Sequence, residues 1–264
     1  MTTNRKKIRL CLLAALRRAK RSGDLRSFAG IITKGLCLGL LAVSFTPYQV
    51  AAADNAAQLS GLSRSLSAQP VAVPQSKRAN FEGERKSRDT RRVADWVVDS
   101  GDNCGMPFAI VDKRAAKVFV FDAGGRLRGA APVLLGLALG DDSVPGIGDR
   151  ELSDIRPEER TTPAGRFVAK LGYNFHGKDI LWVDYNGAVS LHRVISTKPS
   201  ERRLQRLATP TPLDNRISYG CINVPEQFYN NVVSPAFTGT YGVVYVLPET
   251  RSNREIFASY YDVE

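Results

Sequence analysis

The stretch best suited to chemistry is the run ISYGCINV at residues 217–224, which Pro225 follows. Cys221 lies between Gly220, which lets the backbone come close to a ligand, and a segment that begins at Pro225 and is predicted to start a helix. A helix N-terminus carries positive partial charge and free N–H groups, which stabilise a thiolate and a developing oxyanion. The run therefore predicts a reactive cysteine.

A cysteine nucleophile needs a general base that a rigid element holds within hydrogen-bond reach. The chain has two histidines, so the choice is small. His192 lies near the end of a predicted strand at 188–194, which the turn signal Asn186-Gly187 folds back on residues 180–185. His176 falls in the run NFHGK, which is predicted to be an exposed loop. His192 is therefore the predicted base.

The cysteines leave one alternative open. Cys11 and Cys37 lie in a predicted leader, so the mature chain would keep Cys104 and Cys221. A disulfide between these two is chemically reasonable in an oxidising compartment, and it would remove the nucleophile. Cys104 has no activating neighbour in its run GDNCG, which favours a free Cys221. Two cysteines and two histidines without close spacing predict no metal site, and we expect no cofactor.

The positive charge of the chain is concentrated in its N-terminal third. Residues 1–92 carry 18 Lys and Arg against 5 Asp and Glu, whereas residues 93–264 carry 19 against 21. A nucleic-acid-binding domain should carry its basic residues on the folded part, so we expect no nucleic-acid partner.

The leader has the pattern of an export signal. Basic residues precede an apolar run at 35–43, and small residues end at Ala53, where cleavage is predicted. Residues 1–53 are thus a predicted signal peptide, or an N-terminal anchor if residues 28–48 stay in the membrane as a tether. Residues 54–92 are rich in Ala, Ser, Gln and Arg and predict a disordered basic linker.

Residues 93–264 are predicted to form one domain, because some 170 residues can bury a sizeable core. Short β-branched and aromatic runs, separated by turn signals, predict a mostly β fold of the sandwich or barrel type with antiparallel and mixed strands. The expected strands are at 108–111, 118–121, 130–135, 166–171, 180–184, 188–194 and 239–247. One helix at 225–236 follows the cysteine, and a shorter helix at 199–207 is expected with Ser200 as its cap.

The ordered combination of these motifs resembles a known family. The run SYGCIN at 218–223, with His192 upstream and the run TPAGRF at 162–167 before both, is similar to the catalytic domain of the L,D-transpeptidases (YkuD-like). These are exported enzymes that remodel peptidoglycan. The resemblance covers about residues 108–247 and implies a cysteine that attacks a stem-peptide carbonyl.

Carried over residue by residue, the resemblance implies the following site. Cys221 is the nucleophile, His192 the base, and the backbone carbonyl of Arg193 orients the histidine, while Ser218 matches a Ser/Thr position of the motif. The resemblance also implies that the N–H groups of Tyr219, Gly220 and Cys221 form the oxyanion hole. The expected oxyanion and substrate-binding residues are Tyr219, Gly220 and Asn223.

Two features depart from the family pattern. Tyr219 stands where the family usually has a second histidine, so a backbone role survives there but a side-chain role does not. The interval between His192 and Ser218 is longer than usual, so residues 196–215 are interpreted as an inserted lid. Its arginines Arg202, Arg203 and Arg206 are expected either to bind carboxylates of a stem peptide or to be solvated surface.

The expected function is cysteine-dependent acyl transfer through a thioester on peptidoglycan stem peptides, in the periplasm or cell envelope. An amine acceptor, from the wall or from an envelope protein, gives transpeptidation, whereas water gives an L,D-carboxypeptidase or hydrolase. The alternative from another class is a non-catalytic peptidoglycan-binding protein that keeps only the fold.

Overall fold

The computed structural model describes residues 76–264, and these form one folded unit. The predicted signal peptide or anchor at 1–53, the tether at 28–48 and most of the predicted linker lie outside the described residues. Within residues 76–264, no helix combines the length and the apolar character that crossing a membrane requires.

The fold is mostly β, as predicted. Eight strands form one mixed sheet in the order β3-β2-β1-β10-β5-β6-β7-β9, and β4 pairs with β8 in a second, two-stranded sheet. The strands are β1 (Phe108–Asp112), β2 (Lys117–Phe121), β3 (Leu127–Pro132), β4 (Leu135–Gly136), β5 (Gly165–Tyr173), β6 (Asp179–Asp184), β7 (Val189–Arg193), β8 (Arg216–Ser218), β9 (Ile222–Val224) and β10 (Tyr241–Val246).

The two edges of the large sheet are linked. Leu134, two residues beyond β3, exchanges two backbone hydrogen bonds of 2.9 Å with Asn223 in β9. This bridge connects the first and last strands of the order and brings the sheet close to a closed barrel. It also fixes the position of β9, which directly follows Cys221.

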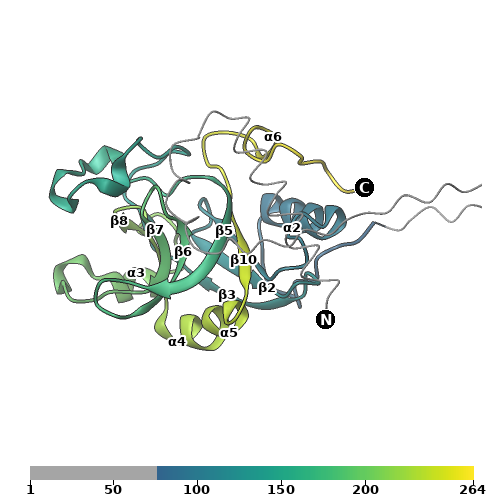
Figure 1. Cartoon of the computed structure of the whole chain (residues 1–264), viewed down its shortest axis with the longest axis horizontal. Coiled ribbons are helices and arrows are strands. Elements are labelled where there is room, and N and C mark those ends of the chain that lie inside the picture. The colour runs from purple at the N-terminus through teal and green to yellow at the C-terminus, as the bar shows by residue number, and fades with distance from the viewer. Residues whose placement is uncertain (1–75) are drawn as a thin grey trace, which may run out of the picture. The chain divides into compact units, whose positions relative to one another are not determined.

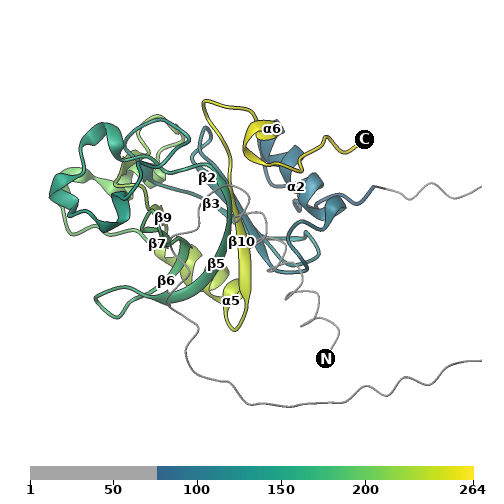
Figure 2. The same ribbon diagram turned by 45° about the horizontal axis from the view of Figure 1, so that its top comes forward.

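Alternating side chains place two cores on the two faces of the sheet. In β1, Ala109 and Val111 face an inner core that also contains Leu191 and Ile222 from the strands of the site. The other face of β1, β2 and β10 is aromatic and is covered by α2 (Arg88–Ser100) and by the C-terminal segment with α6 (Asn253–Ile256). Figures 1 and 2 show α2 and α6 together on this face, away from β7.

The folded unit begins before Val93, so the predicted linker reaches too far. Ser87 caps α2 by accepting a hydrogen bond from the Thr90 N–H group, and Thr90 and Val93 are fully buried. Phe81 is also buried and makes edge-to-face contacts with two phenylalanines of β2. Arg88, Arg91 and Arg92, which contributed to the predicted linker, lie on the partly or fully exposed side of this amphipathic helix.

The helical predictions hold in part. A helical segment does follow Pro225, as α4 (Glu226–Phe228), a π-helical turn (Tyr229–Val233) and α5 (Ser234–Phe237). In the lid, a 3-10 turn (Pro199–Glu201) precedes α3 (Arg203–Ala208), and Arg202 rather than Ser200 occupies the N-cap position of α3. Three further 3-10 turns, Ile147–Asp149, Leu152–Asp154 and Pro157–Glu159, structure the loop between β4 and β5.

Candidate active site

Two neighbouring parallel strands bring the predicted nucleophile and base together. The Asn186-Gly187 turn folds β6 back into β7, and β7 pairs with β9 in a register that sets Leu191 beside Ile222 and His192 beside Asn223. Side chains alternate along a strand, so Leu191 enters the inner core while Ser190 and His192 share the other face. Cys221 lies one residue before β9 and therefore next to that face.

His192 is oriented by the backbone of its neighbour. Its Nδ1 lies 2.7 Å from the carbonyl oxygen of Arg193, and a carbonyl can only accept, so Nδ1 carries the hydrogen. The other ring nitrogen is left to hydrogen-bond with the Cys221 side chain. The three groups are thus arranged as nucleophile, base and orienting acceptor. His176 lies in the exposed turn between β5 and β6 and does not contact Cys221.

The pairing favours the thiolate and the imidazolium. Burial alone would raise the pKa of the Cys221 thiol, but the hydrogen bond and charge of His192, together with Ser190, lower it below its usual value. Burial alone would lower the pKa of His192, but the partnership with Cys221 raises it. Each shift points to proton transfer from sulfur to imidazole.

The prediction that a helix N-terminus activates the Cys221 thiol is wrong. β9 separates Cys221 from α4, which begins at Glu226. The apolar residues Ile222 and Val224 extend the sheet because they fill the inner core beside β7. The groups that lower the thiol pKa therefore come from β7, not from a helix dipole.

Sequence reasoning missed two β7 hairpin residues that touch the sulfur. The hydroxyl oxygen of Ser190 lies 3.6 Å from the Cys221 sulfur, and the carbonyl oxygen of Ala188 lies at the same distance. Ser190 stands two residues before His192, and this spacing in a strand places both on one face. That period-two relation was the signal available in the sequence.

The loop before Cys221 has a conformation that requires glycine. Gly220 has φ +127°, and a Cβ there would lie 2.9 Å from the carbonyl oxygen of Thr161. The Ser218 hydroxyl accepts a hydrogen bond from the Gly220 N–H group at 3.1 Å and donates one to the Cys221 carbonyl at 2.6 Å. Ser218 thus braces the loop.

This bracing changes the expected oxyanion hole. The Gly220 N–H group points at Ser218 and is not available to a ligand. Among residues 76–264, no partner is found for the N–H groups of Tyr219 and Cys221. These two amides are the donors that the loop leaves open.

Asn223 has a different place from the one expected. Asn223 is 1% exposed, and both polar atoms of its side chain are hydrogen-bonded. Nδ2 donates to the Cys221 carbonyl at 3.2 Å, and Oδ1 accepts from Arg203 at 2.8 Å. It therefore joins the lid to the strand that follows the cysteine, and it has little left to offer a substrate.

The lid arginines differ in their surroundings. Arg203 pairs with Glu201 at 2.5 Å as well as with Asn223, and Arg206 donates to the carbonyls of Glu201 and Asp214. Both hold the lid in place. Arg202 is exposed.

Arg193 anchors the end of β7. Its guanidinium donates to the Asp179 carboxylate at 2.9 Å and to the Asn230 side chain at 2.7 Å, and it lies 4.2 Å from the centre of the Tyr229 ring. These contacts fix the carbonyl that orients His192.

Tyr219 forms a stack with the long loop between β4 and β5. The Arg160 guanidinium lies 3.9 Å from the centre of the Tyr219 ring and also donates twice to the Ile155 carbonyl. Tyr219 is 36% exposed, so the ring is covered on one face by the arginine and open elsewhere. The stack ties this loop to the residue just before Gly220.

His192 borders two hollows. One of about 280 Å³ contains Cys221 and is walled by Leu152, Ile195, Arg203 and Tyr219. The other, of about 480 Å³, lies beyond His192 and includes His176, Lys178, Asp179 and Glu226. A ligand in either hollow would lie beside the imidazole.

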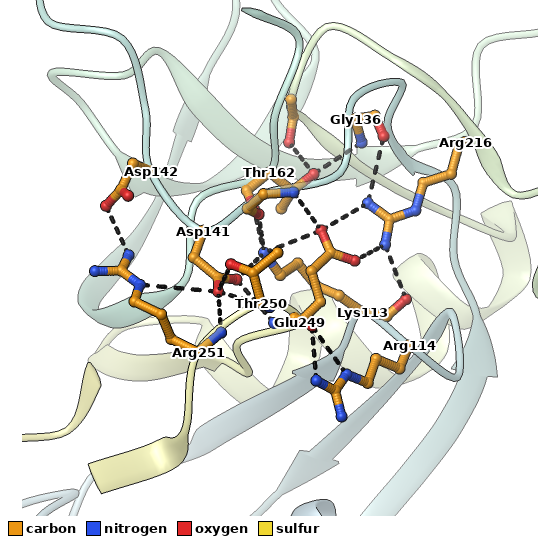
Figure 3. Close-up of polar contacts among 12 residues, drawn as sticks. Lys113, Arg114, Gly136, Asp141, Asp142, Thr162, Arg216, Glu249, Thr250 and Arg251 are labelled. Carbon is orange, nitrogen blue, oxygen red and sulfur yellow. Dashed lines mark hydrogen bonds and ion pairs between the residues drawn. The ribbon is translucent and has the colours of Figure 1, made fainter. Parts of the chain in front are cut away.

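A buried ionic cluster (Figure 3) includes Thr162, whose side chain contacts the cysteine loop at Gly220. Lys113 is fully buried and its ammonium group donates to Asp141 at 2.9 Å and to the Thr162 carbonyl at 2.9 Å, with Glu249 at 3.4 Å. Arg216 at the start of β8 pairs with Glu249. The cluster therefore holds both Thr162 and the strand that leads into the loop.

Cys104 and Cys221 are not joined by a disulfide. Cys104 packs against the aromatic core under α2, whereas the strand after Cys221 belongs to the inner core. Within residues 76–264, no group of three His, Cys, Asp or Glu side chains is arranged to bind a metal ion.

Comparison with known proteins gives similarity in structure alone. No family model and no curated protein matches the sequence. The similar solved structures include an L,D-transpeptidase from Enterococcus faecium, with 15% identity, 54% of this chain and 50% of that chain covered and a TM-score of 0.32. The helical cell shape determining protein Pgp2 from Campylobacter jejuni has 14% identity, 56% and 49% coverage and a TM-score of 0.34.

The catalytic domain of the Enterococcus faecium L,D-transpeptidase is also similar. It has 16% identity, with 53% of this chain and 96% of that chain covered, and a TM-score of 0.28. This chain thus spans about half the length of the two longer structures and nearly all of that domain.

Proposed function

We propose that this protein is a cysteine acyltransferase of the L,D-transpeptidase type that acts on peptidoglycan stem peptides. The observation that carries the proposal is the contact between Cys221 and His192, with the histidine oriented by the Arg193 carbonyl. A thiol whose pKa is lowered by an imidazole inside a hollow is the arrangement that nucleophilic catalysis needs.

The geometry supports the following acylation step. His192 takes the thiol proton, and the Cys221 thiolate attacks a peptide carbonyl of the stem. The tetrahedral oxyanion accepts hydrogen bonds from the N–H groups of Tyr219 and Cys221. As the peptide bond breaks, the imidazolium gives its proton to the leaving amine, and a thioester remains on Cys221.

Deacylation decides between transferase and hydrolase. An acceptor amine attacks the thioester, loses a proton to His192 and forms a new amide, while the sulfur leaves as the thiolate. Water would instead give a free carboxylate. The hollow beyond His192 favours an amine, because it offers a second binding region beside the same imidazole and the carboxylate of Glu226 lines it.

The proposed place of action is the cell envelope. This rests on the predicted export leader at 1–53 and on the substrate, since peptidoglycan lies outside the cytoplasmic membrane. The proposed role is remodelling of the cell wall.

Purified protein incubated with sacculi or isolated stem peptides tests the proposal. We expect new cross-linked or amine-exchanged products with the wild type and none with Cys221→Ala, and a thioester adduct at Cys221 by mass spectrometry. Shortened stems without cross-links would assign the protein as a carboxypeptidase. Unchanged products and no adduct would favour a non-catalytic binding protein and overturn the proposal.

A further inference from the structure

We propose that Ser190 is a further catalytic residue, whose hydroxyl and backbone N–H groups hold the Cys221 sulfur in its thiolate form. The inference rests on the proposed role of Cys221 as nucleophile, and it deepens that role. Ser190 is 5% exposed, and its hydroxyl oxygen lies 3.6 Å from the sulfur. Within residues 76–264, that sulfur is the hydroxyl's one hydrogen-bonding partner.

The register of the sheet explains why Ser190 faces the cysteine. The pairing of β7 with β9 runs from Leu191 beside Ile222 to Arg193 beside Val224. One step back along both strands places Ser190 beside Cys221, where the regular pairing has ended. At that position the N–H group and the hydroxyl of Ser190 donate to the cysteine sulfur rather than to a backbone carbonyl. Both hydrogen bonds lower the pKa of the Cys221 thiol.

The direction of each hydrogen bond follows from what each atom can do. The Ala188 carbonyl, 3.6 Å from the sulfur, can only accept, so it stabilises the neutral S–H group and repels a thiolate. A thiolate can only accept, so the Ser190 hydroxyl must then donate. Ser190 and His192 together offset the effect of the Ala188 carbonyl on the thiolate. Without Ser190, the equilibrium between thiol and thiolate shifts toward the thiol.

This role recurs at both chemical steps. When the sulfur attacks a carbonyl carbon, its negative charge moves to the oxyanion and the hydrogen bond from Ser190 weakens. When an acceptor cleaves the thioester, the electron pair of the breaking C–S bond returns to the sulfur, and Ser190 stabilises the leaving thiolate. The interaction therefore raises the thiolate population near neutral pH at a modest cost in intrinsic nucleophilicity.

A matched pair of variants isolates the hydroxyl. In Ser190→Thr and Ser190→Val the new side chains have nearly the same shape, and both residue types are favoured in strands, but only threonine keeps the hydroxyl donor. Ser100→Ala, at the exposed end of α2, serves as a distant control. The measurement is the rate of alkylation of Cys221 by iodoacetamide in the full chain between pH 5 and 10, followed by peptide mass spectrometry, with circular dichroism to check folding.

We expect the Ser190→Val rate at pH 7 to be roughly 3- to 10-fold below that of Ser190→Thr, with the two rates converging above pH 9.5, because a hydrogen bond to a charged group is lost. Ser100→Ala should follow the wild type, and Ser190→Thr should retain more of the wild-type rate than Ser190→Val. Superimposed Val and Thr profiles, in a background where wild-type Cys221 reacts as a low-pKa thiol, would overturn the role of Ser190 alone. A wild-type Cys221 with an ordinary thiol pKa would overturn the proposed function, and this inference with it.

Discussion

The hydroxyl of Thr162 donates a 2.8 Å hydrogen bond to the carbonyl of Gly220, one residue before the candidate nucleophile. The same hydroxyl oxygen accepts from the Gly136 N–H group at 2.8 Å, and the Thr162 carbonyl accepts from the buried ammonium of Lys113. The peptide group between Gly220 and Cys221 has an N–H group without a partner among the described residues. Its carbonyl is therefore fixed by the side chain of Thr162, a residue that also belongs to the ionic cluster. Precise placement of the oxyanion donors depends on that contact.

Thr162→Val removes the hydroxyl and its hydrogen bonds but keeps the shape of the side chain. The variant leaves the Gly220 carbonyl and the Gly136 N–H group without their buried partner, and each unsatisfied group costs about 1–3 kcal/mol. We expect a lower free energy of unfolding in urea and slower acylation of Cys221 by a carbapenem. Thr162→Ser keeps the hydroxyl and should retain most of both quantities. Equal losses in the two variants would show that packing of the methyl group, not the hydrogen bond, matters.

Lys113→Met should be strongly destabilising. The change leaves the carboxylates of Asp141 and Glu249 buried without their shared cation, and breaking a buried pair costs about 3–5 kcal/mol. Arg254→Met is the matched control, because Arg254 pairs with Asp262 on the exposed surface, where such pairs contribute about 0–1 kcal/mol. Urea unfolding followed by tryptophan fluorescence measures both. Arg216 also pairs with Glu249, and Arg251 lies 3.9 Å from the Asp141 carboxylate. A loss no larger than that of the control would show that these two arginines suffice to neutralise the carboxylates.

The same cluster predicts how stability depends on acid. Burial alone would raise the pKa of Asp141, but hydrogen bonds from Lys113, Thr250 and the Glu249 N–H group hold it well below its usual range. A carboxyl group with a depressed folded pKa stabilises the fold above its unfolded pKa, near 3.9, and this contribution is lost as the pH falls toward the folded value. The difference in urea midpoint between wild type and Asp141→Asn should therefore be largest above about pH 5 and should shrink below pH 4. A difference that stays constant down to pH 3 would contradict the shift.

The reactivity of Cys221 should persist below neutral pH and should depend on His192. The imidazole lowers the pKa of the thiol, and the thiol raises the pKa of the imidazole, so the pairing shifts the equilibrium toward thiolate and imidazolium and the alkylation rate should rise at a lower pH than for an ordinary thiol. In His192→Gln the partner is lost while burial remains, so the alkylation rate of Cys221 should rise only above about pH 8.5. Alkylation of Cys104 in the same samples is the internal reference and should not change between the variants. Identical pH profiles for Cys221 in both proteins would contradict the pairing.

Some parts of the candidate site could be predicted from the sequence, and others depend on contacts between distant segments. The hairpin signal Asn186-Gly187 correctly predicted that the strand of His192 folds back on β6, because turn chemistry is local. The pairing of His192 with Cys221 was inferred from chemistry, since a reactive thiol needs a base. The strand β9 was not predicted, because three residues between the cysteine and Pro225 are too few for a strand pattern and only pairing with β7 makes them a strand. Lys113 and Thr162 come together across 49 positions, and no local pattern announces such a contact.

The stack of Arg160 on Tyr219 predicts a last property, the mobility of the loop beside the cysteine. Tyr219→Phe keeps an aromatic face for the guanidinium, whereas Tyr219→Leu removes it, and a cation–π contact at an exposed site contributes about 0.5–1 kcal/mol. Loss of the stack should loosen the segment between the turns Ile147–Asp149 and Pro157–Glu159 without unfolding the sheet. We expect trypsin to cut Tyr219→Leu in this loop several times faster than Tyr219→Phe, with nearly equal thermal midpoints. Equal cutting of both variants would mean that the two Arg160 hydrogen bonds to Ile155 hold the loop without help from Tyr219, whose ring would then be free to contact substrate.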